Sequence, residues 1–431
     1  MTTWHASSST VGASAVRDLS RSRHGTASTL VIAAMLVSAC GGGTGGASDT
    51  ALVTPAVPAA SPGAVPSAPF VQKSNLVYVG AFRVPQGSSD QTTFNYGGTA
   101  LAYNPANNSL FMTGHDQQQL TAEIRIPALA NTSNVNNLAT ASILQSFRDP
   151  TEGKIESINR NDPNAKKIGG HLVYNGKLYV SAFAYYDGDG TQSASHFVRP
   201  LSLSTSGQVQ GPFKVGSQYA GFVSGYMTTI PQEWRAHFGG PALTGNCCIA
   251  IAGIQSNGPA VSVFDPENVG RLSPVPATPV LGYPYGNILG PGETVTNSIY
   301  NMSTVIRGVV FPSGSRSVLF FGRIGIGRYC YGGGDECGDP ADPYKGTHAY
   351  PYVYQVWAYD ANDLLAVKNG SKLQHQVQPY AIWNFNLPFE SNGTHFIGGV
   401  AYDEASRNLY VSQQCEDDNC APIIHAFKIN I

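Results

Sequence analysis

The feature that most constrains the fold of this chain is a glycine-led segment that occurs five times. Its copies are aligned on the second residue of each segment, which is Gly98 (GGTALAY), Gly170 (GGHLVY), Gly240 (GGPALTG), Gly308 (RGVVF) and Gly399 (GGVAY). They are spaced by about seventy residues, and the last interval is about twenty residues longer. Self-similarity at a fixed period indicates a repeat architecture, so each unit is expected to be one small sheet.

Within each unit the order of the apolar segments also repeats. The glycine-led strand is followed by a turn rich in Asn, Gly, Pro and Asp, which suits a hairpin. The second strands that follow are SLFMTGH, KLYVSAF, CIAIAGI, SVLFFGR and NLYVSQQ, and the third strands are AEIRIPAL, FVRPLSL, VSVFDPEN, YQVWAYD and IIHAFKI. Four units have a fourth strand, in ATASILQSF, QVQGPFKVG, TPVLGYPYG and YAIWNFNL. The fifth unit lacks one, because the chain ends at Ile431.

An apolar strand without a unit of its own, LVYVGAFRV at residues 76–84, can supply the missing strand. A ring closed in this way leaves no long exposed sheet edge. The chain therefore resembles a β-propeller: an all-β fold of five four-stranded antiparallel blades over residues 73–431, closed by the N-terminal strand. Six or seven blades would require further strands in the long loops. Two short helices are predicted, at residues 232–238 and 362–368.

The leading glycines have a physical role in such a ring. Innermost strands crowd toward the axis, where a missing side chain permits close approach of two backbones. Both faces of a blade pack against neighbouring blades, so runs such as SVLFF need not alternate with polar residues.

Residues 1–39 resemble a bacterial lipoprotein signal peptide. Arginines precede an apolar run at residues 30–37 that is too short to span a bilayer. The run ends in VSAC, and the resemblance implies that Cys40 becomes the lipidated first residue. An ordinary secretory signal is the alternative. Residues 40–72 are rich in Gly, Pro and Ala and indicate a tether to the cell envelope, on the periplasmic side or at the outer surface.

Charge and cysteine content indicate which partners and which covalent cross-links the protein can have. The 25 basic and 27 acidic residues give a net charge of −2 without a basic cluster, which disfavours a nucleic-acid partner. An even number of cysteines remains after Cys40, and in an exported chain this favours disulfides. The spacing predicts the pairs Cys330 with Cys337, Cys415 with Cys420, and Cys247 with Cys248. Two buried free thiols are the alternative for the last pair.

Loop lengths separate the two rims of the predicted ring. Connections from strand two to strand three, and from strand four to the next blade, emerge on one rim, which we call the long-loop rim. The other connections emerge on the opposite rim, the turn rim. The long segments 148–168, 184–195, 217–240, 287–305, 323–352 and 388–396 are expected on the long-loop rim. Function concentrates in such loops, so we expect the site there, over the axis.

Residues with catalytic chemistry map to the long-loop rim. The catalytic candidates are His115, Asp116, His171, Asp187, Arg307, Tyr329, His348 and Glu390. Histidines titrate near neutral pH, and glycoside hydrolysis requires paired carboxylates. Arg307 stands where the other units have glycine, and there it would clamp an anion or pair with a loop acid.

The tyrosine-rich insertion at 323–352 predicts a ligand-binding surface, since aromatic rings stack on sugars. A lid that only packs on the rim is the alternative. The ligand-binding candidates are Arg323, Arg328, Tyr331, Tyr344 and Trp234. The DGDG sequence at 187–190 is compatible with calcium or with a solvated turn. No other cofactor or metal site is indicated.

These observations predict a monomeric envelope lipoprotein whose propeller binds an extracellular glycan or another polar ligand on the long-loop rim. The first alternative is a carbohydrate-active enzyme, a glycoside hydrolase or uronate lyase, that uses the same rim. The second is a scaffold for other envelope proteins. GxSxG and HExxH motifs are absent, which removes support for a serine-elbow hydrolase or a zincin.

Overall fold

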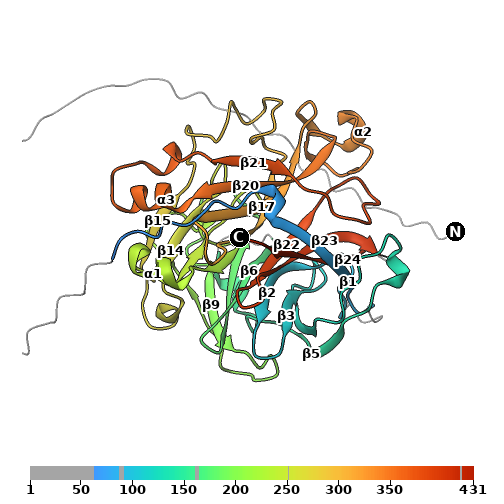
Figure 1. The fold of residues 1–431 in the computed structure, drawn as a ribbon, viewed down its shortest axis with the longest axis horizontal. Coiled ribbons are helices and arrows are strands. Elements are labelled where there is room, and N and C mark those ends of the chain that lie inside the picture. The colour runs from blue at the N-terminus through green and yellow to red at the C-terminus, as the bar shows by residue number, and fades with distance from the viewer. Residues whose placement is uncertain (1–62, 87–91, 161–164, 251, 418–419) are drawn as a thin grey trace, which may run out of the picture. The chain divides into compact units, whose positions relative to one another are not determined.

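Five four-stranded antiparallel sheets stand around a common axis in the computed structural model (Figure 1). The structure describes residues 63–86, 92–160, 165–250, 252–417 and 420–431. The predicted signal peptide and the lipidation site Cys40 lie outside the described residues. No helix in the described part of the chain is both long and apolar enough to cross a membrane.

Every blade has four strands, which run outward from the axis in the following order. Blade 1 contains β2 (Thr99–Asn104), β3 (Ser109–Thr113), β4 (Thr121–Arg125) and β5 (Ser142–Arg148). Blade 2 contains β6 (Lys166–Tyr174), β7 (Lys177–Ala184), β9 (His196–Pro200) and β10 (Gln210–Phe213). Blade 3 contains β11 (Met227–Thr229), β12 (Ala242–Thr244), β14 (Val261–Phe264) and β15 (Ala277–Leu281). Blade 4 contains β16 (Val305–Val310), β17 (Ser317–Gly325), β20 (Tyr352–Asp360) and β21 (Ala381–Asn384). Blade 5 contains β22 (Ile397–Asp403), β23 (Asn408–Asp417), β24 (Ala421–Ile429) and β1 (Leu76–Arg83).

The remaining elements lie in the connections. Two small ladders pair β8 (Tyr186–Asp187) with β13 (Ala252–Gly253) and β18 (Cys330–Gly332) with β19 (Gly346–His348). The helices are α1 (Gln232–Phe238), α2 (Gly334–Cys337) and α3 (Ala361–Lys368). Short 3-10 helices occupy Lys73–Asn75, Val135–Asn137, Lys154–Ser157, Ala220–Phe222, Pro266–Asn268 and Gln374–Gln376.

The innermost strands form a closed ring, which confirms the predicted five-bladed propeller. Strand β2 contacts β6, β6 contacts β11, β11 contacts β16, β16 contacts β22, and β22 returns to β2. Second strands are buried on both faces; every residue of β17 is buried. Neighbouring blades therefore cover each sheet as the unalternating apolar sequence indicated.

The ring is closed by the N-terminal strand, as predicted. Strand β1 pairs antiparallel with β24 from Leu76 opposite Ile429 to Arg83 opposite Ile423, and Figure 1 shows the two strands side by side. Both ends of this pairing are fastened. Asn75 and Asn430 exchange hydrogen bonds at one end, and the Arg83 guanidinium binds the Asp417 carboxylate at the other, with Nε–Oδ2 2.5 Å. The last blade thus gains the strand that its own sequence lacks.

The packed part of the chain begins before Lys73. The backbone N–H of Val71 donates to the Ser317 hydroxyl, and the Val71 side chain is buried in the apolar core between blades 4 and 5. The Phe70 ring stacks on Tyr380 at 4.1 Å. The C-terminal end of the predicted tether therefore packs on blade 4.

Glycines let the innermost strands approach one another at the axis. A Cβ atom on Gly169 would lie 2.0 Å from the Ser224 carbonyl oxygen, and one on Gly398 would lie 2.0 Å from that of Gly98. Of the five glycines predicted to lead an innermost strand, Gly240 does not do so. Gly239 takes a left-handed conformation, φ 73°, that ends helix α1, and Gly240 follows it.

Blade 3 is therefore shifted relative to the prediction. Its innermost strand is β11, and the segment PALT, predicted as the innermost strand, forms the second strand β12. The segment CIAIAGI, predicted as the second strand, belongs to the connection from β12 to β14. Only three residues of β11 pair with β12, so the strand gives a weak sequence signal.

Five of the six long segments connect strands on the long-loop rim. The segment 217–240 divides, because residues 214–226 reach β11 on that rim whereas α1 joins β11 to β12 on the turn rim. The turn rim also carries α3, which lies between β20 and β21. Both predicted short helices are confirmed as α1 and α3.

Substitution of Phe82 by Ala is expected to destabilise the ring. Its ring is fully buried between β1 and blade 1, so the cost should be about 3–5 kcal/mol. Val77, on the same strand and 45 % exposed, is the matched control, and its change to Ala should cost about 0.5 kcal/mol or less. Urea unfolding of both variants measures the difference. Equal small losses would mean that β1 is not integral to the fold.

Candidate functional site

A polar cavity opens at the axis on the long-loop rim. Its volume is about 200 Å³. It is lined by Tyr96, Thr99, Asp116, Gln119, Lys167, Ile168, Phe183, Tyr185, Arg307, Phe396 and Gln414, and we call it the axial pocket. Its lining comes from blades 1, 2, 4 and 5, so it exists only in the closed ring.

Arg307 reaches the axial pocket from a bulge in β16. The pairing of β16 with β17 shifts between Ile306 and Gly308, and equivalent shifts occur around Gly169 in blade 2 and Gly398 in blade 5. Those two glycines have no room for a side chain, whereas blade 4 carries arginine at the same place. The sequence prediction that Arg307 replaces an axial glycine is thus explained by the bulge geometry.

The Arg307 guanidinium has no hydrogen-bond or ion-pair partner among the described residues, and its Nε is buried. Burial lowers the pKa of Arg307, while the nearby Asp116 carboxylate and Tyr185 raise it. The predicted alternative, a salt bridge to a loop acid, is not formed in the described part of the chain. An unpartnered cation in a restricted space favours an anionic ligand.

Lys167 forms an ion pair with Asp116, so the Asp116 carboxylate is not available to neutralise Arg307. Its Nζ lies 2.5 Å from Asp116 Oδ2 and donates to the Asp116 carbonyl oxygen at 2.9 Å. The two cations and one acid of the pocket lining therefore leave a net charge of +1.

Aromatic rings form two walls of the axial pocket. Lys167 Nζ lies 5.8 Å from the centre of the Tyr185 ring. The Phe396 ring is stacked on the Arg323 guanidinium, 3.4 Å away, and Tyr352 lies on the same guanidinium at 4.1 Å. Arg323 is 4 % exposed, and burial lowers its pKa to about 10. Arg323 therefore holds the pocket wall and does not face solvent.

Amide side chains fix the backbone around the pocket. Gln119 Oε1 accepts from the Ile168 N–H at 2.6 Å, and Gln414 Nε2 donates to the Gly97 carbonyl at 3.0 Å. Sequence reasoning missed Gln119, Lys167, Tyr185 and Phe396. The available signal was position, since Lys167 lies two residues before the axial Gly169, in the innermost strand of blade 2.

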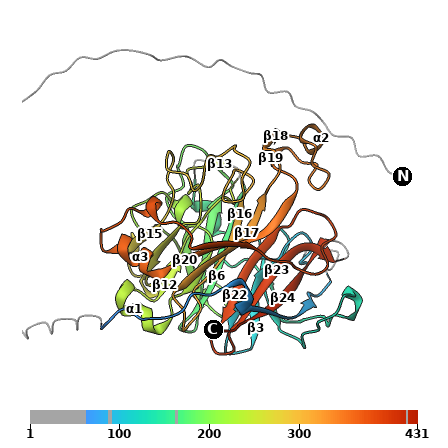
Figure 2. The same ribbon diagram turned by 45° about the horizontal axis from the view of Figure 1, so that its top comes forward.

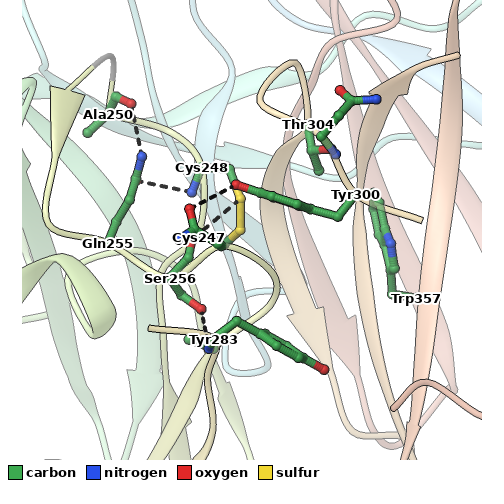
Figure 3. The surroundings of a disulfide bond; sticks show 12 residues. Cys247, Cys248, Ala250, Gln255, Ser256, Tyr283, Tyr300, Thr304 and Trp357 are labelled. Carbon is green, nitrogen blue, oxygen red and sulfur yellow. Dashed lines mark hydrogen bonds between the residues drawn. A yellow bond between two sulfur atoms is a disulfide. The ribbon is translucent and has the colours of Figure 1, made fainter. Parts of the chain in front are cut away.

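The Cys247–Cys248 disulfide lies directly beside the strand that carries Arg307. The backbone of Cys247 forms an isolated antiparallel bridge with Ile306. The Cys248 N–H donates to Gln255 Oε1 at 3.1 Å, and Figure 3 shows the disulfide between Gln255 and Tyr300. All three predicted disulfides are formed. The vicinal pair thus anchors the connection from β12 to β14 against β16.

Two predicted histidines occupy different environments. The His115 ring packs against Tyr96 at the pocket edge, with ring centres 5.7 Å apart. His171 is buried between blades 1 and 2, where its Nε2 contacts the Thr113 and Thr121 hydroxyls at 3.3 and 3.0 Å. His171 therefore lies outside the axial pocket.

Three other catalytic candidates are engaged in local hydrogen bonds. Asp187 accepts from Asn159, Thr191 and the Gln192 N–H. Glu390 accepts from the Tyr354 hydroxyl at 2.5 Å and the Gly393 N–H at 2.9 Å, in a separate pocket of about 300 Å³ lined by blade 4 and the connection from β21 to β22. His348 is buried within the insertion, against Asp339. The structure does not gather these residues with Arg307 and Asp116 in the axial pocket.

The remaining candidates separate into exposed and buried groups. The insertion carries Arg328, Tyr329, Tyr331 and Tyr344, of which Tyr331 and Tyr344 are well exposed. Trp234 is wrong as a ligand-binding residue. Its indole is fully buried in α1, packs on Phe311 and donates to the Ser315 carbonyl.

The described residues contain no group of three or more His, Cys, Asp or Glu side chains placed to hold a metal ion. In the DGDG turn, Asp187 accepts hydrogen bonds from N–H and O–H donors, which occupy the oxygen atoms that calcium would need. The DGDG turn is thus held by hydrogen bonds within the chain.

No protein-family model matches the chain, and no curated protein matches it. Among solved structures, the chain is similar to an exo-1,5-α-L-arabinanase from a bovine ruminal metagenomic library, with 10 % identity over 79 % of this chain and 95 % of that chain and a TM-score of 0.40. The native arabinanase of Bacillus subtilis gives the same four values. The β-propeller domain of Myceliophteria thermophila Cps50 gives 7 % identity, coverage of 76 % and 82 %, and a TM-score of 0.30. At these values the similarities carry no argument about ligand or activity.

The buried His171 should make the free energy of unfolding depend on pH. Burial lowers its pKa to about 3 from 6.5, so the unfolded chain binds a proton at pH values where the folded chain does not. The stability that neutral His171 contributes is complete above pH 6.5 and is lost as pH falls toward 3.

Replacing His171 by Gln should therefore reduce the slope of unfolding free energy against pH by about 1.4 kcal/mol per pH unit between those two pKa values. Urea unfolding over that range measures the slope. Leu172→Ala, a nearby change without a titrating group, should lower stability at every pH and keep the wild-type slope. An unaltered slope in the His171 variant would contradict the assignment.

Proposed function

We propose that this propeller binds a carboxylate-bearing glycan, such as a uronate oligosaccharide, with one sugar unit in the axial pocket. The observation that carries the proposal is the unpartnered Arg307 guanidinium in a lining of net positive charge. Arginine matches the planar geometry of a carboxylate with two parallel hydrogen bonds. Tyr185 and Phe396 supply ring surface for the apolar face of a sugar, and the Oε1 atom of Gln414 supplies an acceptor for a hydroxyl.

The geometry supports binding more than hydrolysis. A glycoside hydrolase needs two carboxylates on either side of the scissile bond. Of the described residues that line the axial pocket, Asp116 is the one acid, and it is bound to Lys167. The other two acids predicted for this role, Asp187 and Glu390, are held in separate hydrogen-bond networks. A uronate lyase is the enzymatic alternative that the pocket favours, because Arg307 would neutralise the carboxylate and Tyr185 stands beside it.

We further propose that the protein acts outside the cytoplasm, as a lipoprotein anchored through Cys40. Three disulfides within one chain support an oxidising compartment. The scaffold alternative, binding of other envelope proteins over a blade side, has no comparable supporting feature among the described residues.

Replacement of Arg307 by Met is expected to weaken binding of oligogalacturonate by about tenfold to a hundredfold, because a charge-assisted hydrogen-bond pair is lost. Isothermal calorimetry measures the affinity, with neutral oligosaccharides of matched length for comparison. Arg125→Met, at an exposed position on the turn rim, is the matched control and should bind like the wild type. Equal affinity of the Arg307 variant and the wild type would refute the assignment. Appearance of unsaturated products would shift the conclusion to the lyase.

A further inference from the structure

The insertion in blade 4 stands out from the ring on the long-loop rim. Residues 326–351 leave β17, form the β18–β19 hairpin and helix α2, and return to β20. Figure 2 shows β18, β19 and α2 projecting beyond the blades. The Cys330–Cys337 disulfide closes the loop between β18 and α2. The insertion is thus a separate feature above the ring.

A buried polar network gives the insertion a defined shape. The Asp339 carboxylate accepts from His348 Nδ1 at 2.8 Å, from the Tyr352 hydroxyl at 2.6 Å and from the Ala341 N–H at 2.9 Å. His348 Nε2 faces the Gly332 and Tyr344 carbonyl oxygens at 3.2 and 3.0 Å. Buried and satisfied networks of this kind rigidify the elements that they join. The insertion is therefore built to hold one conformation.

This rigid feature presents tyrosine rings to solvent. Tyr331 is 60 % exposed and Tyr344 is 79 % exposed. In the hairpin Cys330 lies opposite the buried His348, and Tyr331 lies opposite Thr347. Successive strand residues face opposite sides, so Tyr331 points away from the polar network. Large exposed rings on a rigid support are typical of ligand-contact surfaces.

The base of the insertion is continuous with the axial pocket. Ala349 contacts the backbone at Gly325, and Ala341 lies against Gly393 in the segment that leads to Phe396. Arg323 and Tyr352 lie where the insertion leaves and rejoins blade 4. The Arg323 guanidinium lies over the Tyr352 ring and over the ring of Phe396, which lines the pocket.

We infer that Tyr331 and Tyr344 form a second contact surface for the same ligand, which is a polysaccharide chain that leaves the axial pocket across the rim. The inference rests on the proposed function. The pocket holds about 200 Å³, less than the roughly 300 Å³ at which sites for larger ligands begin. It therefore admits about one sugar unit, and the rest of a chain must lie outside it. The insertion surface makes the second contact intramolecular, so affinity rises with chain length.

The test is a calorimetric titration of the full protein with oligogalacturonates of increasing length, from the monosaccharide upward. For the wild type, the long oligomers should bind about tenfold or more tightly than the monosaccharide. Tyr331→Ala combined with Tyr344→Ala should abolish most of this gain, whereas Tyr331→Phe with Tyr344→Phe should keep it, because the rings remain. Leu373→Ala, 58 % exposed on the turn rim, is the matched control and should keep the gain. Thermal unfolding checks that all variants are folded.

The outcomes separate the two proposals. A length-dependent gain that survives the double Ala change, or a wild type without such a gain, overturns the insertion surface and leaves the axial pocket standing. A gain that requires the tyrosines but is independent of Arg307 overturns the axial assignment and supports the insertion surface. A protein that binds no uronate of any length overturns both.

Discussion

The antiparallel pairing of β1 with β24 is the interaction on which the rest of the structure depends. Without it, blade 5 would expose the backbone groups of β24 as a long open edge. The same blade contributes the innermost strand β22, which packs on β2 of the first blade and on β16 of the fourth. Arg307 from blade 4, Gln414 from blade 5 and Asp116 from blade 1 share one pocket only in a closed ring. The axial pocket is therefore formed by the same event that closes the ring.

Most of the architecture is legible in the sequence because it is repetitive. The same order of strands recurs in each unit, so the blade count and the closing strand can be predicted from the comparison of the units. Blade 3 is the exception, and for a local reason. The Gly239-Gly240 doublet resembles the axial glycines but terminates a helix, and the true innermost strand β11 is short. The prediction that Trp234 binds ligand fails for a related reason. A position in a loop on the rim does not specify which way the indole faces.

The site is less predictable than the fold, since it is assembled from residues far apart in the sequence. Arg307 is identifiable because it breaks a repeated pattern. Lys167, Tyr185 and Phe396 break no pattern, and only the closed ring brings them to one cavity. His171 and His348 illustrate the opposite error. Their chemistry suggests catalysis, but burial and local partners give them roles in packing and in holding the insertion.

Closure through the two ends of the domain also determines the order in which the protein can mature. Chains are synthesised from the N-terminus, so β1 emerges first and its partner β24 emerges last. Throughout that interval β1 has no neighbour in the sheet it will complete, and its edge is available to other chains. Completion of the ring is thus a late event that requires the entire domain, and a polypeptide interrupted anywhere before β24 retains an unpaired apolar strand at its beginning.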